Sequence, residues 1–188
     1  MPPKTKITRE MILDAAFELV RERGHECLNA RAVAQKLGCS TQPVLYSFKT
    51  VDELRQAVYR RADEYHSAYI MPGEGGSMRA VGLRYVRFGY EEKNLFRFLF
   101  QTNQFGGMEL AALFDDPQLS GLLGLMAAEH GIGAEEAKER FLTSFALVHG
   151  LASLLANNAM EYDEERCARV LENVSGSERA SRKGQEHV

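Results

Sequence analysis

Apolar residues recur at spacings of three and four along most of this chain, which is the pattern of amphipathic α-helices. No stretch shows the alternating pattern of a β-strand, so the sequence predicts an all-α fold of about nine helices. The first helix is expected to end at Gly24, because glycine commonly follows the last helical turn. Its buried face is formed by Ile12, Ala15, Ala16, Leu19 and Val20.

Two shorter apolar stripes follow, separated by Gly38, and they predict two short helices joined by a turn. Asn29 and Ser40 precede these helices, where a polar side chain can accept the free backbone N–H groups of the first turn. Pro43 falls in the first turn of the second helix, where a proline costs little. The stripes consist of Leu28, Val33, Ala34 and Leu37 in the first helix and Val44, Leu45 and Phe48 in the second.

The second of these helices also carries short or planar polar side chains, which suit base edges and phosphates in a DNA major groove. Lys49 lies beside the start of the next helix, where its charge and free backbone amides can bind a phosphate. Arg31 is a second phosphate candidate. The pattern predicts a DNA-reading helix-turn-helix, and the alternative is an ordinary three-helix packing unit. The predicted DNA-binding residues are Arg31, Ser40, Thr41, Gln42, Pro43, Tyr46, Ser47 and Lys49.

Four consecutive segments of this region resemble the N-terminal part of the TetR/AcrR family of transcriptional repressors. The segments are residues 8–24, 29–34, 40–48 and 49–54. The resemblance implies a DNA-binding head, a larger helical domain for effector binding and dimerisation, and action as a repressor. The family usually has Tyr where Leu45 stands, His where Ser47 stands and often Lys where Val51 stands.

A capping box at Thr50–Glu53 opens a fourth helix, which is expected to run to about Ile70. The glycine-rich segment Pro72–Gly76 follows it and is the clearest break in the chain. The C-terminal residues have almost no apolar content and are expected to be disordered. The predicted parts are a helix-turn-helix domain at 1–50 (motif at about 29–48), a linking helix at 51–70, a larger helical domain at 71–174 and a tail at 175–188.

Further helices are expected in the larger domain, where capping residues precede apolar stripes. Ser77 can cap the first of them, and Asp116–Pro117 can open another with a capping acid and an N-terminal proline. Gly131 is expected to end that helix. The remaining helices are expected around Asn94–Gln101, from about Ala134 to Met160, and from Asp163 to about Val174.

The helix that contains residues 141–156 is apolar on nearly every side, so every side must be covered. One covering is the core of its own subunit, and the other is a second subunit. The family resemblance implies that the last two helices, at 134–160 and 163–174, form a four-helix bundle with those of a partner. The predicted dimer interface comprises Val148, Gly150, Leu151, Ala152, Leu155, Val170 and Leu171.

Aromatic residues are concentrated in the middle of the chain, where they can line a pocket for an apolar or aromatic effector. The alternative is that they form an ordinary core. His149 lies in the long apolar helix, where it can touch a ligand or hydrogen-bond within the core. The predicted pocket residues are Tyr85, Phe88, Phe96, Phe100, Phe145 and His149.

Composition narrows the predicted function. The formal net charge is −3, but residues 1–50 carry an excess of Lys and Arg and residues 67–188 an excess of Asp and Glu. A basic head on an acidic body is compatible with DNA binding. The three cysteines show no metal-ligand spacing and fit reduced thiols, so we expect no metal and no cofactor. The sequence shows no catalytic motif, no signal peptide and no apolar run long enough to span a membrane.

The sequence therefore predicts a cytoplasmic, non-enzymatic regulator that responds to a small molecule. It is expected to act as a repressor and to bind a near-palindromic operator as a homodimer. The alternative is a small-molecule-binding helical protein, or an enzyme, whose head no longer reads DNA.

Overall fold

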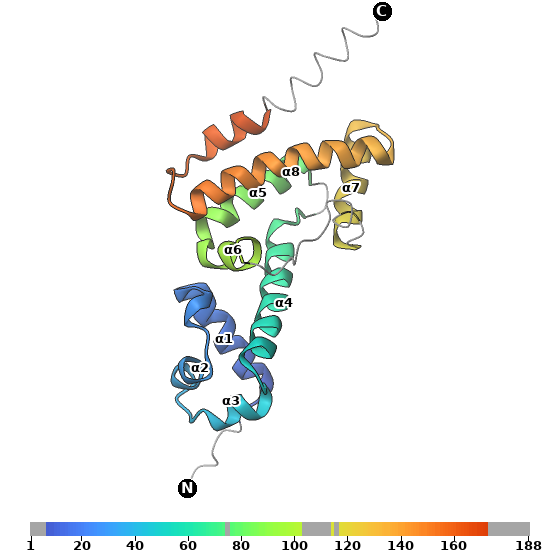
Figure 1. The fold of residues 1–188 in the computed structure, drawn as a ribbon. Coiled ribbons are helices and arrows are strands. Elements are labelled where there is room, and N and C mark those ends of the chain that lie inside the picture. Colours follow the sequence, from blue (N-terminus) through green and yellow to red (C-terminus); the bar gives the residue numbers. More distant parts are fainter. Residues whose placement is uncertain (1–6, 74–75, 103–113, 115–116, 173–188) are drawn as a thin grey trace, which may run out of the picture. The chain divides into compact units, whose positions relative to one another are not determined.

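The computed structural model describes residues 7–73, 76–102, 114 and 117–172. Across these residues the chain forms helices joined by turns and contains no strand, which confirms the predicted all-α fold (Figure 1). The packing separates the chain into two compact units, unit 1 and unit 2. Unit 1 comprises Met1–Ala68 and Glu92–Gln104, and unit 2 comprises Tyr69–Glu91 and Phe105–Val188.

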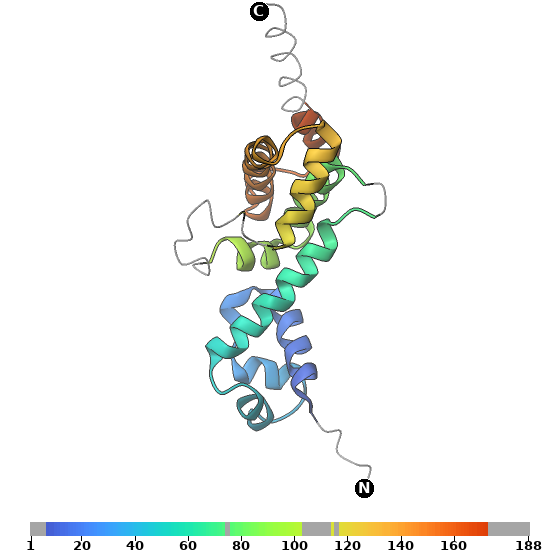
Figure 2. The same cartoon turned by 90° about the vertical axis from the view of Figure 1, so that its right-hand side faces the viewer.

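Unit 1 contains the predicted helix-turn-helix region, drawn in blue and teal in Figures 1 and 2. Its first elements are α1 (Arg9–Arg23), the 3-10 helix η1 (His25–Cys27), α2 (Ala30–Lys36), α3 (Gln42–Ser47) and most of α4 (Val51–Ile70). The first helix, α1, packs against η1, α2 and α3. The core between them is made of fully buried apolar side chains, among them Ile12, Val20, Val33, Val44, Phe48, Leu54 and Val58.

The end of α1 and the start of α2 follow from local sequence, as predicted. Gly24 closes α1 with φ of 85° and donates its N–H to the carbonyl oxygen of Val20 at 2.8 Å. This backbone conformation requires a glycine, since other residues rarely adopt it. Asn29 opens α2 by accepting the N–H of Ala32 at 2.9 Å.

The start of α3 differs from the prediction. The helix begins at Gln42, so the capping position belongs to Thr41, whose side chain makes no capping hydrogen bond. Ser40 is therefore not the cap. Thr41 already has helical backbone angles, and Pro43 has no N–H for a cap to satisfy, so α3 can begin without one.

The start of α4 has the expected capping box in a modified form. Glu53 donates its N–H to Oγ1 of Thr50 at 3.0 Å. The carboxylate of Glu53 accepts the N–H of Lys49 at 2.9 Å, one residue before the position that a standard box uses. The helix then runs to Ile70, as predicted.

Unit 1 also contains α6 (Lys93–Phe100), which the sequence analysis placed in the larger domain. The ring of Phe98 lies 5.7 Å from that of Tyr59 and 5.6 Å from that of His25. Periodicity alone does not reveal this assignment, because the apolar face of α6 would suit the core of either unit.

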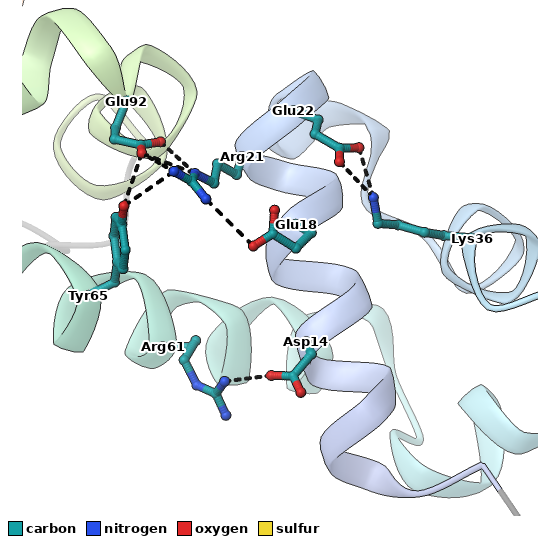
Figure 3. A network of polar contacts seen from close by, with 8 residues as sticks. All are labelled: Asp14, Glu18, Arg21, Glu22, Lys36, Arg61, Tyr65 and Glu92. Atoms are coloured by element: carbon teal, nitrogen blue, oxygen red, sulfur yellow. Dashed lines mark hydrogen bonds and ion pairs between the residues drawn. The ribbon is translucent and has the colours of Figure 1, made fainter.

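A polar network holds the start of α6 to α1 and α4 (Figure 3). Arg21 of α1 donates through Nε to both carboxylate oxygens of Glu92, at 3.0 and 2.8 Å. Tyr65 of α4 donates its hydroxyl to Oε1 of Glu92 at 3.0 Å. Glu92 is buried, and these hydrogen bonds compensate for the loss of its hydration. The hydrogen bond to Glu92 also raises the pKa of Arg21, so the guanidinium stays charged.

Unit 2 is built around α5 (Met78–Glu91) and α8 (Ala134–Ala156), which lie side by side (Figure 1). They come very close at Gly89, where an added Cβ would lie 2.7 Å from Cβ of Ala152. The helix α7 (Pro117–His130) packs against both. The core shared by these helices includes Val81, Leu122, Met126, Ala137 and Phe141.

The other expected helices of unit 2 also form in the described residues. Ala80 donates its N–H to Oγ of Ser77 at 3.2 Å, which confirms the predicted cap of α5. Gly131 follows α7 with φ of 63°, as predicted. Residues 164–172 are helical, within the range expected for the last helix.

The long helix α8 ends at Ala156, earlier than the predicted Met160. Asn158 adopts a left-handed backbone conformation, with φ of 56°, and donates its N–H to the carbonyl oxygen of Leu155 at 3.0 Å. Asparagine tolerates this conformation better than other non-glycine residues, and it closes the helix as a glycine would.

Two predictions fall on residues that the structure does not describe: Asp116 as the cap of α7, and the disordered tail at 175–188. In the described ranges, no helix combines the length and apolar character that crossing a membrane requires.

Candidate nucleic-acid interface

The recognition helix predicted from the sequence, α3, has two faces of opposite character. Val44 and Phe48 are 1% and 2% exposed and pack in the core of unit 1. Gln42, Leu45 and Tyr46 share the other face, because residues three and four apart are neighbours on a helix. Leu45 is 53% exposed and Tyr46 is 90% exposed. This surface therefore presents an amide, an apolar side chain and a phenol to solvent.

The exposure of Leu45 corrects one prediction. The apolar pattern predicts that Leu45 is buried in one stripe with Val44 and Phe48. The helix has only six residues, and Val44 and Phe48, four positions apart, fill its buried side. Leu45 is turned from Val44 by about 100° around the helix axis, which leaves it in solvent.

The other predicted DNA-binding residues are accessible to different degrees. Arg31 is exposed on α2, the helix that packs against α3. The remaining ones flank or belong to α3: Ser40, Thr41, Gln42 and Lys49 are exposed, and Pro43 and Ser47 are partly exposed.

Arg9, which the sequence analysis did not single out, connects the start of α1 to both ends of the turn that carries Lys49. Its guanidinium donates to the carbonyl oxygen of Ser47 and lies 3.9 Å from the centroid of the Phe48 ring. It also forms an ion pair with Glu53 at 3.3 Å. Ser47 and Glu53 are 38 and 44 residues away from Arg9 in the sequence, so no local pattern could have revealed these contacts.

At the start of α4, two of the backbone N–H groups near the predicted phosphate clamp are already used. The Lys49 side chain is exposed, but the N–H groups of Lys49 and Glu53 already have acceptors within the protein. The ammonium group of Lys49, rather than these two amides, is therefore available to a phosphate. Arg55 pairs with Asp52, and Arg9 pairs with Glu53, each at 3.3 Å. These cations reduce the repulsion that the two carboxylates would exert on a phosphate.

Unit 2 contains a small aromatic cluster at three of the predicted effector positions. The Tyr85 hydroxyl and Nδ1 of His149 are 2.9 Å apart. The ring of Phe145 lies 5.9 Å from Tyr85 and 5.4 Å from His149. Burial raises the pKa of Tyr85 and lowers the pKa of His149, so both are neutral at pH 7. The cluster thus places one polar pair in apolar surroundings.

The other three predicted pocket residues have different surroundings. Phe88 is fully buried in unit 2 and packs edge-on against Tyr69 at 5.3 Å. Phe96 and Phe100 belong to unit 1, where their rings are 5.0 Å apart and Phe100 lies 5.1 Å from His66. The predicted pocket residues are therefore divided between two units.

The predicted dimer residues fall into buried and exposed groups. Val148, Ala152 and Leu155 are buried in unit 2, and Ala152 lies against Gly89 of α5. The structure therefore assigns these three residues to the core of their own subunit, the alternative that the sequence left open, and not to an exposed contact.

The C-terminal half of α8 exposes a narrow stripe of small and apolar residues. Ala146, Gly150 and Leu154 recur every fourth position and are exposed, and Leu154 is 47% exposed. An added Cβ at Gly150 would meet no atom within 4 Å. Of the other predicted interface residues, Leu151 and Val170 are partly exposed and Leu171 is buried.

Comparison with known proteins shows sequence similarity over part of the chain. No protein-family model matches the chain. The class D tetracycline repressor protein of Escherichia coli and the class H protein of Photobacterium damsela subsp. piscicida are each 37% identical to it over 76 residues. The match covers 40% of this chain and 34% of each relative, so the chain matches about a third of the length of these repressors.

The fold is similar to known structures over nearly the whole chain. A TetR-like transcriptional regulator from Rhodococcus sp. RHA1 has a TM-score of 0.63 at 20% identity, over 93% of this chain and 99% of that one. A TetR family member from Streptomyces coelicolor A3 has a TM-score of 0.58 at 21% identity, over 88% and 96%. A TetR variant from Acinetobacter baumannii AYE in complex with minocycline has a TM-score of 0.61 at 19% identity, over 93% and 98%.

These observations define an all-helical protein with an N-terminal helix-turn-helix and a second helical unit. Over 76 residues the chain is similar in sequence to tetracycline repressors, and its fold is similar to that of TetR-like regulators.

Proposed function

We propose that this chain is a ligand-responsive transcriptional regulator whose head binds double-stranded DNA. The observation that carries the proposal is the exposed face of α3. Gln42, Leu45 and Tyr46 project from a helix whose opposite face is fixed in the core by Val44 and Phe48. A phenol that is 90% exposed contributes little to folding, so its presence favours a role in binding.

The side chains around α3 fit the two kinds of contact that a DNA-reading helix makes. The amide of Gln42 can bind the edge of an adenine through two hydrogen bonds. Lys49 and Arg31 can bind phosphates, which position the protein but carry no sequence information. In this proposal residues 1–50 bind DNA, and residues 71–174 provide effector binding and dimerisation.

We also propose that the protein acts as a homodimer. The recognition helix has six residues and makes few base contacts alone. Two copies in successive major grooves, about 34–36 Å apart, would read a near-palindromic operator. The exposed stripe of Ala146, Gly150 and Leu154 supports this assembly, because open space at Gly150 allows a second helix to approach closely.

The effector in this proposal is an apolar or aromatic small molecule that binds in unit 2. The Tyr85–His149 pair, beside Phe145, offers hydrogen-bonding groups in apolar surroundings, which is typical of small-molecule sites. The TetR variant from Acinetobacter baumannii AYE, which has a similar fold, was solved in complex with minocycline. An effector that binds more tightly to a conformation unable to bind DNA lowers the affinity for DNA. The decrease equals the difference in its binding free energy between the two conformations, and operator DNA must weaken effector binding by the same factor.

A second candidate is a small-molecule-binding helical protein, or an enzyme, whose head no longer reads DNA. Leu45, Ser47 and Val51 favour this second candidate, because the usual TetR/AcrR pattern has other residues at these positions. The exposed phenol of Tyr46, on the same face of α3 as the amide of Gln42, favours the regulator instead.

Selection from a library of random DNA duplexes tests the proposal. The full chain is expected to enrich one near-palindromic sequence, and the enriched duplex should compete with itself but not with a scrambled version. Arg79→Ala provides a control, because it also removes one positive charge but belongs to unit 2, where Arg79 pairs with Glu172 at 2.7 Å. A library that stays random after repeated rounds would favour the second candidate.

A further inference from the structure

Leu45 is 53% exposed, lies outside the buried core of unit 1 and can make none of the hydrogen bonds assigned to its neighbours. We propose that Leu45 reads the C5 methyl group of a thymine in the major groove. It would thereby select an A·T pair at one position of each half-site through an apolar contact. The inference rests on the proposed DNA binding and adds the base that the chain prefers.

The geometry of α3 holds Leu45 away from the core. Gln42, three residues before it, and Tyr46, one residue after it, are both exposed on the same side of the helix. Val44 and Phe48 occupy the buried side, and Phe48 donates its N–H to the carbonyl oxygen of Val44 at 2.8 Å. Rotation of α3 to bury Leu45 would expose one or both of these core residues.

The far end of α3 is also fixed, so the direction of Leu45 is part of the fold. Arg9 donates to the carbonyl oxygen of Ser47 and lies over the ring of Phe48 at 3.9 Å. The same guanidinium pairs with Glu53 at the start of α4. The helix that carries Leu45 is therefore connected to both α1 and α4.

The chemistry of the major groove leaves one partner for an aliphatic side chain. Its edges carry hydrogen-bond donors and acceptors, and the thymine C5 methyl is the only apolar group among them. Against any other base edge, Leu45 would remove water from a polar atom and offer no hydrogen bond in return. Against a thymine, the contact buries apolar surface on both sides.

A protein-docking patch fits these residues less well. Such patches are contiguous apolar surfaces, whereas Leu45 lies between the amide of Gln42 and the phenol of Tyr46, with the cationic Lys49 beyond the helix end. An aliphatic group among hydrogen-bonding and positive groups matches the mixture of polar edges, methyl groups and phosphates in a DNA groove.

Deoxyuridine tests the proposal, because it differs from thymidine only by the missing C5 methyl. The duplex enriched by the full-length protein is remade with each thymine replaced in turn, and the dissociation constant is measured by fluorescence anisotropy. For the wild-type protein, one replacement in each half-site is expected to weaken binding about fourfold, the effect of losing one buried methyl contact. The other replacements should have little effect.

The variants Leu45→Ala and Gln42→Ala separate the methyl contact from the rest of the interface. Leu45→Ala should bind the thymine and uracil duplexes with equal affinity at that position. Gln42→Ala should bind more weakly overall but keep the fourfold penalty. Leu45→Met has an apolar side chain of similar volume, so it should keep most of the fourfold penalty for uracil. Both residues are on the surface, and an unchanged melting temperature will show that the three variants are folded.

Each other outcome overturns a defined part of the account. If the uracil penalty is the same in Leu45→Ala as in the wild type, or if no single thymine matters, Leu45 does not read a methyl group. The same conclusion follows if the enriched half-sites contain only G·C pairs. In these cases the proposed DNA binding still holds. If no duplex is enriched at all, the proposed function fails and this inference fails with it.

Discussion

Arg21 and Glu92 are 71 residues apart in the sequence, and Nε of Arg21 lies 3.0 and 2.8 Å from the two carboxylate oxygens of Glu92. Glu92 is buried, and it also accepts a hydrogen bond from Tyr65. The pair fastens the start of α6 to α1, so unit 1 is built from two separate segments of the chain (Figure 3). Its stability should therefore depend on Glu92.

We expect Glu92→Gln to lower the free energy of unfolding by about 1–3 kcal/mol, because a charge-assisted pair is replaced by a neutral amide with fewer acceptor sites. Urea denaturation measures this change. The matched control is Glu22→Gln, since Glu22 pairs with Lys36 at 2.8 Å on the surface. Its loss should cost about 0–1 kcal/mol. Equal losses for the two variants would show that Glu92 has no special weight in unit 1.

Lys49 and Gln42 should affect DNA binding in different ways. We expect Lys49→Ala to weaken binding to all sequences alike and to reduce the slope of log affinity against log salt by about one. Gln42→Ala should instead relax the preference for one base pair, by about 1–3 kcal/mol. Salt titrations on the enriched and scrambled duplexes measure both effects. An unchanged salt slope in Lys49→Ala would remove Lys49 from the phosphate contacts.

Arg9 should act on DNA binding by positioning α3. Arg9→Ala loses the contacts with Ser47 and Phe48, so operator affinity is expected to fall. The free energy of unfolding should change little, because the surface ion pair with Glu53 should contribute less than about 1 kcal/mol. Arg9→Lys keeps the charge but not the planar guanidinium that spans these groups, so it should also bind weakly. Affinity measurements at one salt concentration compare the two variants. Full recovery in Arg9→Lys would mean that only the charge matters.

Two glycines of unit 2 should respond differently to the same substitution. At Gly89 an added Cβ would lie 2.7 Å from Cβ and 2.8 Å from Cα of Ala152, so Gly89→Ala should destabilise unit 2 by about 1–3 kcal/mol. At Gly150 the space within the subunit is open, so Gly150→Ala should cause no clash inside unit 2 and no comparable destabilisation. Thermal unfolding distinguishes these results, and equal destabilisation by both would contradict the packing of α5 on α8.

The open site at Gly150 also tests the proposed dimer. Gly150→Leu adds a large side chain where nothing in the subunit lies within 4 Å, so the subunit should fold normally. If a partner helix packs there, the added side chain should shift the protein towards monomer. Sedimentation velocity measures the shift. A wild-type protein that sediments as a monomer at micromolar concentration would refute the dimer directly.

His66 should make unit 1 sensitive to acid. Burial lowers the pKa of His66 to about 4, from the value of 6.5 that an exposed histidine shows. The unfolded chain therefore binds a proton between these pH values that the folded chain does not, and stability is lost as the pH falls through this window. The loss is on the order of 3 kcal/mol near pH 4. His66→Leu should show a shallower fall in the free energy of unfolding over this range, and an unchanged slope would contradict the assignment.

The sequence predicted most of the helices because their limits are set locally. Asn29, Thr50 and Ser77 lie within three residues of the backbone groups they cap, and Gly24 adopts a conformation that few other residues allow. The end of α8 was missed because the left-handed conformation of Asn158 is an exception to the behaviour of most residues.

Features that depend on distant contacts could not be predicted in this way. Arg9 is an ordinary exposed arginine until α3 and α4 are folded against it. The aromatic residues of α6 have the spacing of any buried helix, so the sequence placed Phe96 and Phe100 with Tyr85 although they belong to unit 1. Leu45 was assigned to the core because periodicity does not show how narrow the buried side of a six-residue helix is.

The central claim is that the exposed face of α3 reads DNA sequence. Its most direct test is the ratio of the affinities of the full chain for the enriched duplex and for a scrambled duplex of the same composition, measured by fluorescence anisotropy at one salt concentration. We expect the wild-type protein to prefer the enriched duplex by a factor of about 10³ or more. The double variant Gln42→Ala/Tyr46→Ala should lose most of this preference, and its melting temperature should stay the same. A ratio near one for the wild-type protein, or a double variant that discriminates as well as the wild type, would contradict the claim.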